Sequence, residues 1–145
     1  MEITPDKRYQ TLLVLWFAML MSVVMYFVFT LLSPPGVYTP GDRTWLLIFV
    51  ITALGTLLVG ASFPVKAKLL ERSVERQDPI LVQKALVVAC AICEVSVLLG
   101  VLEYFLIGNR EYCLLLLVGG AGIALHFPRR SQLEAARYTK PGQFT

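Results

Sequence analysis

The stretch "ALVVACAICEVSVLLGVLEYFL", from Ala85 to Leu106, is almost entirely apolar or small, yet it carries a carboxyl group at Glu94. At about 1.5 Å per residue, a helix of this length covers roughly 33 Å, which matches a bilayer hydrocarbon core of about 30 Å. The stretch therefore predicts a membrane-spanning helix. Because a charged side chain is costly at the middle of a bilayer, Glu94 is a candidate functional residue.

Three further apolar blocks repeat this pattern along the chain. Of the 145 residues, 57% are hydrophobic, and the apolar residues gather at 11–33, 44–63, 80–107 and 112–127. Blocks of this kind are typical of membrane spans. Two short basic segments, 64–79 and 128–145, are expected in the cytoplasm. We therefore expect a single all-α transmembrane domain over residues 1–145, an integral membrane four-helix bundle made of two tandem helical hairpins.

The basic residues are concentrated on one side of these blocks. Eleven of the 13 Lys and Arg residues precede the first block, lie between the second and third or at their border, or follow the fourth. The other two connections hold only Arg43 and Arg110. Because Lys and Arg accumulate in cytoplasmic loops, the pattern predicts a multi-pass protein of the inner (plasma) membrane with both termini in the cytoplasm. The positive charge then encodes topology, and no nucleic-acid partner is expected.

The two predicted hairpins end in similar ways, which indicates an internal repeat. The second block ends in "FPVKAKLLERSVER" and the fourth in "FPRRSQLEAARY". Proline restricts the residue before it and starts a helical turn well. We therefore expect each returning span to bend at Phe63–Pro64 or Phe127–Pro128 and to continue as a short basic amphipathic helix, with Lys66 turned toward water.

The two glutamates of the third span are predicted to have different surroundings. Glu94 lies ten residues beyond Lys84, about 15 Å along the helix and so near the midplane. Glu103 lies about 29 Å along it, where we expect a solvated border residue. Glu94 is therefore the candidate buried proton site, and it needs a polar partner at its own depth. The candidate partners are hydroxyl groups: Ser22, Thr52, Thr56 and Ser62.

Small residues follow one face of the same helix. Successive residues turn by about 100°, which aligns four side chains on a narrow stripe: Ala89, Cys93, Ser96 and Gly100. The last block carries Gly119 and Gly122. Small residues let membrane helices approach closely, so these six positions are predicted to be helix-packing residues.

The sequence offers no recognisable catalytic or metal-binding set. The single His126 cannot supply two axial haem ligands, and no His follows Cys93 as a c-type haem site would require. We expect His126 at the membrane interface. No Ser/His/Asp set, zinc-ligand set or glycine-rich phosphate loop is present in the sequence. The expectation is a non-enzyme that needs no cofactor and no metal.

Residues 44–108 resemble the helical hairpin of the proteolipid (c) subunits of rotary ATPases. That family has a cytoplasmic Arg-Gln-Pro loop and a mid-membrane carboxylate some twenty residues later. Here "ERQDP" contains Arg76, Gln77 and Pro79, with Asp78 inserted, and Glu94 follows Arg76 by 18 residues. The resemblance implies that Glu94 matches the ion-binding carboxylate. The second block lacks the dense glycine repeat of that family, and two further spans are present.

Two functions remain open from the sequence. The first is a non-catalytic small polytopic membrane protein, a scaffold or accessory subunit of a membrane complex. The second is a proton-linked proteolipid-like subunit or small transporter that uses Glu94. In both, the expected partners are the lipid bilayer and other membrane subunits, or further copies of the chain.

Overall fold

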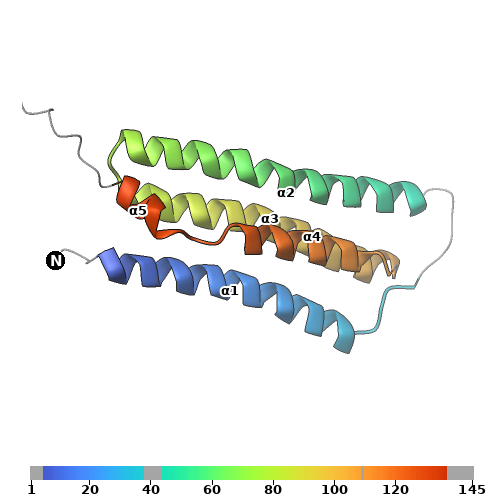
Figure 1. The fold of residues 1–145 in the computed structure, drawn as a ribbon. Coiled ribbons are helices and arrows are strands. Elements are labelled where there is room, and N and C mark those ends of the chain that lie inside the picture. Colours follow the sequence, from blue (N-terminus) through green and yellow to red (C-terminus); the bar gives the residue numbers. More distant parts are fainter. Residues whose placement is uncertain (1–4, 38–43, 109, 137–145) are drawn as a thin grey trace, which may run out of the picture.

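The computed structural model describes residues 5–37, 44–108 and 110–136, and these residues form helices joined by short connections, with no strand among them (Figure 1). The elements are α1 (Pro5–Leu32), α2 (Thr44–Glu75), α3 (Pro79–Ile107), α4 (Tyr112–Leu125) and α5 (Arg130–Ala135). The prediction of an all-α fold is confirmed.

Three of these helices, α1, α2 and α3, are long and apolar enough to cross a membrane. Their outward surfaces are apolar, with large side chains such as Phe17, Phe49 and Leu57 exposed. The fourth predicted span, at 112–127, is shorter than expected. α4 has 14 residues and is therefore about 21 Å long. A helix that crosses the membrane needs roughly 20 residues, or about 30 Å.

The helices are not arranged as two packed hairpins. α3 packs along both α2 and α4, while α1 contacts α3 and α4 from the opposite side to α2 (Figure 1). The α3–α4 pair therefore lies between α1 and α2, and the expectation that α1 and α2 form a packed hairpin is wrong. The reason lies in α3, which has the most extensively buried face of the described helices and so takes the central place.

The small residues of α3 and α4 form the centre of this arrangement. Ala89, Cys93 and Ser96 are fully buried. A Cβ atom added at Gly119 would lie 2.5 Å from Val97 Cγ2 and 2.9 Å from the Cys93 carbonyl oxygen. At Gly122 it would lie 2.8 Å from Cys93 Sγ. Side chains at these positions would force the helices apart, so glycine permits the close approach of α4 to α3.

Gly100 belongs to the same contact from the α3 side. A Cβ atom there would lie 2.9 Å from Leu115 Cβ and 3.0 Å from the Tyr112 carbonyl oxygen. All six small residues singled out in the sequence are thus buried between helices of this one chain.

α3 is closed at both ends by residues that suit helix termini. At its N-terminus the Asp78 side chain accepts a hydrogen bond from the Ile80 N–H, and Pro79 occupies the first helical position. At its C-terminus Gly108 adopts a left-handed conformation with φ 71°, and its N–H donates to the Tyr104 carbonyl. Local sequence signals therefore define this helix on both sides.

The segment after α1 lies against the C-terminal end of α3. The Gly36 N–H donates to the Tyr104 carbonyl at 3.1 Å, and the Tyr104 hydroxyl donates to the Ser33 carbonyl at 2.7 Å. A Cβ atom at Gly36 would lie 2.3 Å from the Phe105 carbonyl oxygen, so only glycine fits this approach. These contacts fix the end of α1 to α3.

The two Phe-Pro steps behave differently. α2 continues through Pro64 to Glu75 as one helix, which agrees with the expected helical continuation beyond Phe63–Pro64. Buried Ser62 and Lys66 hold α2 in the bundle on both sides of the proline. The residue four positions before it, Gly60, faces open space, which lets its carbonyl tilt away from the proline ring.

At the second Phe-Pro step, α4 ends at Leu125, and a short non-helical segment leads to α5. The His126 N–H is shared between the carbonyls of Gly122 and Ile123, and the Phe127 N–H donates to the Ala124 carbonyl. The last turn therefore tightens before Pro128, as helices commonly do at their C-termini. The expectation of a bend at Phe127–Pro128 is met more strongly than predicted, because the helix stops there and the chain continues as the short helix α5.

Candidate functional site

Glu94 lies on α3 where that helix faces α1, and the Ser22 hydroxyl contacts its Oε1 atom. Ser22 is one of the four hydroxyl-bearing residues that the sequence offers as partners. The two residues are 72 positions apart in the sequence, so the contact depends on the packing of α1 against α3. The structure therefore joins a carboxyl and a hydroxyl group near the middle of the apolar layer.

The Ser22 hydroxyl contacts two oxygen atoms but has only one hydrogen to donate. The Ser22 hydroxyl lies 2.7 Å from the Met19 carbonyl oxygen as well as against Glu94. A serine hydroxyl has one hydrogen. If that hydrogen is donated to Met19, the contact with Glu94 is a hydrogen bond only when Glu94 carries a proton and donates it to Ser22.

The pair is not sealed within the chain. Glu94 and Ser22 are each partly exposed, and the neighbouring Val95 and Leu98 on α3 are exposed. The Glu94 carboxyl therefore lies at the edge of the α1–α3 contact rather than inside the core. In a bilayer, this edge faces either lipid or another protein.

The prediction for Glu103 is wrong. Glu103 is 0% exposed, whereas a solvated border residue was expected. The reason is its position on the helix: Glu103 lies three residues beyond Gly100 and continues the buried stripe of α3 toward Ile107. Helical periodicity carried one turn further would have identified it, whereas depth along the helix axis did not.

A second group of polar side chains is buried where α4 ends. His126 is 1% exposed, so it is buried among the helices rather than at the protein surface. Its Nε2 lies 2.8 Å from the Ser62 hydroxyl, and its ring packs against Phe63 with the ring centroids 4.6 Å apart. The Cys93 thiol lies 3.4 Å from the same Ser62 oxygen. Residues from α2, α3 and the end of α4 thus meet at one point.

Donors from two other helices satisfy the carbonyl groups at this end of α4. The Trp16 indole N–H, on α1, donates to the Ile123 carbonyl at 2.8 Å. The Lys66 ammonium, on α2, donates to the His126 carbonyl at 2.9 Å. A helix end buried away from water needs such partners, because its last carbonyls have none within the helix. This arrangement explains how α4 can end inside the protein.

Lys66 differs from its sequence expectation because it points into the protein. It lies beyond Pro64, outside the predicted span, and is 8% exposed rather than turned toward water. Burial lowers the pKa of its ammonium group, Cys90 opposes this shift and Arg129 reinforces it. A cation near the C-terminus of a helix is nevertheless favourable, because it faces the negative end of the helix dipole.

The Ser62–His126 pair has the composition of a nucleophile and base, but its geometry favours a structural role. The Ser62 hydroxyl also donates to the Val59 carbonyl of its own helix at 2.6 Å. With its one hydrogen used there, Ser62 accepts from His126 Nε2. No third group orients the ring among the contacts of the described residues, and these residues hold no cluster of three or more metal-ligating side chains.

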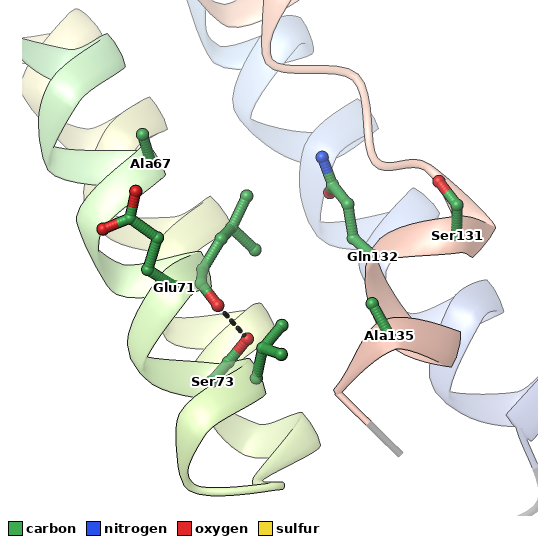
Figure 2. A pocket seen from close by; sticks show the side chains of 8 residues that line it. Ala67, Glu71, Ser73, Ser131, Gln132 and Ala135 are labelled. Carbon is green, nitrogen blue, oxygen red and sulfur yellow. Dashed lines mark hydrogen bonds between the residues drawn. The ribbon is translucent and has the colours of Figure 1, made fainter. Parts of the chain in front are cut away.

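A shallow apolar pocket lies between the end of α2 and α5 (Figure 2). Its volume is about 310 Å³, and its lining includes Ala67, Leu70 and Val74 from α2 and Ala135 from α5. Glu71 and Gln132 border it from the two sides (Figure 2). The Ser73 hydroxyl donates to the Leu70 carbonyl at 2.6 Å, so its hydrogen is not free for a ligand.

Comparison of the chain with protein families, curated proteins and solved structures finds no match.

Proposed function

We propose that the protein is a non-catalytic polytopic protein of the inner (plasma) membrane that acts as a scaffold or accessory subunit, joined to other membrane subunits or to further copies of itself. The exposed apolar surfaces of α1, α2 and α3 support a membrane location. The concentration of basic residues on one side supports cytoplasmic termini. In this arrangement α4 and residues 126–127 together make the fourth crossing.

The observation that carries the proposal is the partial exposure of Glu94. A carboxyl group at the middle of a bilayer is expensive next to lipid, and polar groups there usually face protein. Ser22 covers one side of Glu94, while the exposed Val95 and Leu98 mark an open surface beside it. A helix from another subunit that packs on this surface would shield the carboxyl group and could offer it a hydrogen bond.

The test is the mass of the gently solubilised particle. The wild-type protein is expected as an assembly of fixed stoichiometry, either with copies of itself or with other subunits. Glu94→Gln should retain the assembly because the amide keeps its hydrogen-bonding capacity, whereas Glu94→Leu should release monomers. Glu75→Leu, at an exposed position near the end of α2, is the matched control and should leave the mass unchanged. A wild-type monomer without partners would contradict the proposal.

A second candidate function is proton-linked, as in a proteolipid-like subunit or small transporter. It is supported by the Ser22–Glu94 pair, whose two hydrogen bonds are satisfied together when Glu94 is protonated. The resemblance of residues 44–108 to a proteolipid hairpin fits the antiparallel packing of α2 on α3. Glu94 would then bind and release the transported proton.

Carboxyl-reactive carbodiimide tests this second function, since it modifies protonated carboxyl groups in apolar surroundings. Glu94, which is partly exposed, should be labelled at neutral pH and less at alkaline pH, and peptide mass spectrometry should locate the adduct. The fully buried Glu103 is an internal control. Equal labelling of both residues, or labelling that does not depend on pH, would contradict a proton site at Glu94.

A further inference from the structure

A small pocket lies at the end of the bundle where α1 begins, between α1, α3 and α5. Its volume is about 200 Å³. Its lining comes from all three helices and includes Arg8, Thr11, Leu12, Ile80, Gln83 and Leu133. The pocket therefore combines one cation and two uncharged polar side chains with an apolar wall.

One nitrogen of the Arg8 guanidinium in this pocket lacks a hydrogen-bond partner in the part of the chain that the structure describes. Its Nε atom is inaccessible to solvent and has no hydrogen-bond partner within the described residues. Guanidinium N–H groups are strong donors that favour carboxylate and phosphate oxygens, and a buried donor without an acceptor costs free energy. An anionic ligand in the pocket would supply the missing acceptor.

The other lining residues narrow the kind of anion. The Gln83 amide, on α3, can donate a second hydrogen bond. The Thr11 hydroxyl is already engaged by the Lys7 carbonyl at 2.9 Å, so it offers an oxygen rather than a hydrogen. Leu12, Ile80 and Leu133 form an apolar wall. A ligand with a charged phosphate and an apolar body fits this division.

The charges near the pocket favour a singly charged anion over a highly charged one. Two cations adjoin pocket residues in the sequence: Lys7 precedes Arg8, and Lys84 follows Gln83. A third cation, Arg130, lies over the Tyr9 ring at 4.8 Å from its centroid. Asp78 and Glu134 also lie beside pocket residues in sequence and oppose them. Asp78 already binds the Ile80 N–H at the start of α3, so the helix end itself is occupied.

The pocket lies at the predicted cytoplasmic border of the membrane, because its lining residue Gln83 directly precedes Lys84 on α3. Phosphate groups of lipids occupy this level, and their acyl chains extend into the apolar layer. We propose that this pocket binds the phosphate of an anionic phospholipid, with Arg8 and Gln83 as donors and Leu12, Ile80 and Leu133 in contact with its apolar part. The site is independent of Glu94.

Native mass spectrometry of the purified full chain tests this proposal by counting retained lipids. Phosphatidylglycerol and phosphatidylcholine are added in turn to the delipidated protein, because both carry a phosphate but only the first is a net anion. The wild type should prefer phosphatidylglycerol by about fivefold, the effect of one well-placed basic residue near the membrane surface. Arg8→Gln should abolish this preference, and Gln83→Met should weaken the binding of phosphatidylglycerol.

Arg76→Gln is the matched control, since Arg76 is exposed and lies outside the pocket. It should keep the wild-type preference. Equal losses in Arg8→Gln and Arg76→Gln would overturn the proposal in favour of diffuse surface charge, and so would a wild type without any preference. Displacement of the lipid by millimolar inorganic phosphate would also overturn it, because the pocket would then be a site for free phosphate.

Discussion

At the scale of single residues, two glutamates on one helix show how packing decides the surroundings of a carboxyl group. Glu94 was expected to be the buried residue and Glu103 the solvated one, yet Glu103 is fully buried and Glu94 is partly exposed. Depth along the helix could be predicted from the sequence. The direction in which each side chain points depends on where α1, α2 and α4 pack, and residue counting from Lys84 does not contain that information.

At the end of α4, packing also decides the surroundings of His126 and Lys66. Both were expected near water, and both are buried because α4 is short and its terminal carbonyls need donors. The sequence signal was the Phe-Pro step that ends the helix. That the donors would be Trp16 and Lys66 could not be predicted, since both come from other helices.

Trp16→Phe tests whether α4 depends on a donor from α1. The substitution removes the indole N–H that donates to the Ile123 carbonyl but keeps a ring able to pack against Phe127. Because the Ile123 carbonyl also accepts from the His126 N–H, we expect a loss of about 1 kcal/mol in unfolding free energy, the value of one hydrogen bond. Thermal or denaturant unfolding in detergent would measure it.

Trp45→Phe is the control for this prediction, because Trp45 is 64% exposed on α2. It should change the stability little. If the two substitutions cost the same, the loss would reflect the size of the ring, and the hydrogen bond to α4 would have no measurable role.

At the scale of helices, the close contact of α3 with α4 rests on glycine. Gly119→Ala would place a Cβ atom 2.5 Å from Val97 Cγ2 and 2.9 Å from the Cys93 carbonyl. The backbone oxygen cannot move aside cheaply, so we expect a loss of about 1 to 3 kcal/mol, as for other overpacked cores. The midpoint of denaturant unfolding would report this loss.

Gly60→Ala is the matched substitution on α2, where no atom lies within 4 Å of the added Cβ. It should be neutral or slightly stabilising, because alanine favours helix over glycine by up to about 1 kcal/mol. A protein destabilised equally by both changes would show that backbone flexibility, and not the α3–α4 contact, explains the glycines.

The ends of the helices show which sequence signals are sufficient to predict a helix boundary. The predicted span 80–107 agrees with α3, which begins at Pro79 after the Asp78 cap and ends at Ile107 before Gly108. The identical Phe-Pro dipeptides of α2 and α4 have opposite outcomes. Local sequence could not separate the two cases, because the difference arises from buried contacts of α2 on both sides of Pro64.

At the scale of the whole molecule, the helical class and the apolar blocks could be predicted, while the order of the helices in space could not. Tandem hairpins suggested that neighbours in sequence would pack together. Instead the α3–α4 pair lies between α1 and α2 (Figure 1). The small-residue faces of α3 and α4 could be recognised in the sequence. No sequence signal indicated that α1 and α2 would pack on opposite sides of the α3–α4 pair.

The proposed topology can be checked by labelling single cysteines in intact cells. Cys90 and Cys93 are buried, whereas Cys113 is partly exposed. In a Cys113→Ser background, a cysteine introduced at an exposed connection should therefore dominate the reaction with a membrane-impermeant maleimide. Arg110→Cys, between α3 and α4, should be labelled from outside, whereas Arg72→Cys, near the end of α2, should react only after lysis. The reverse pattern would contradict cytoplasmic termini.

Photo-crosslinking in native membranes can show whether a protein neighbour covers the surface beside Glu94. A photoreactive amino acid would replace Val95, which is 46% exposed next to Glu94, or Leu57, which is 70% exposed on α2. We expect a discrete product from position 95, of the mass of a dimer or of the chain with one partner, and we expect its loss in the Glu94→Leu background. No product at position 95, or the same products from position 57, would contradict it.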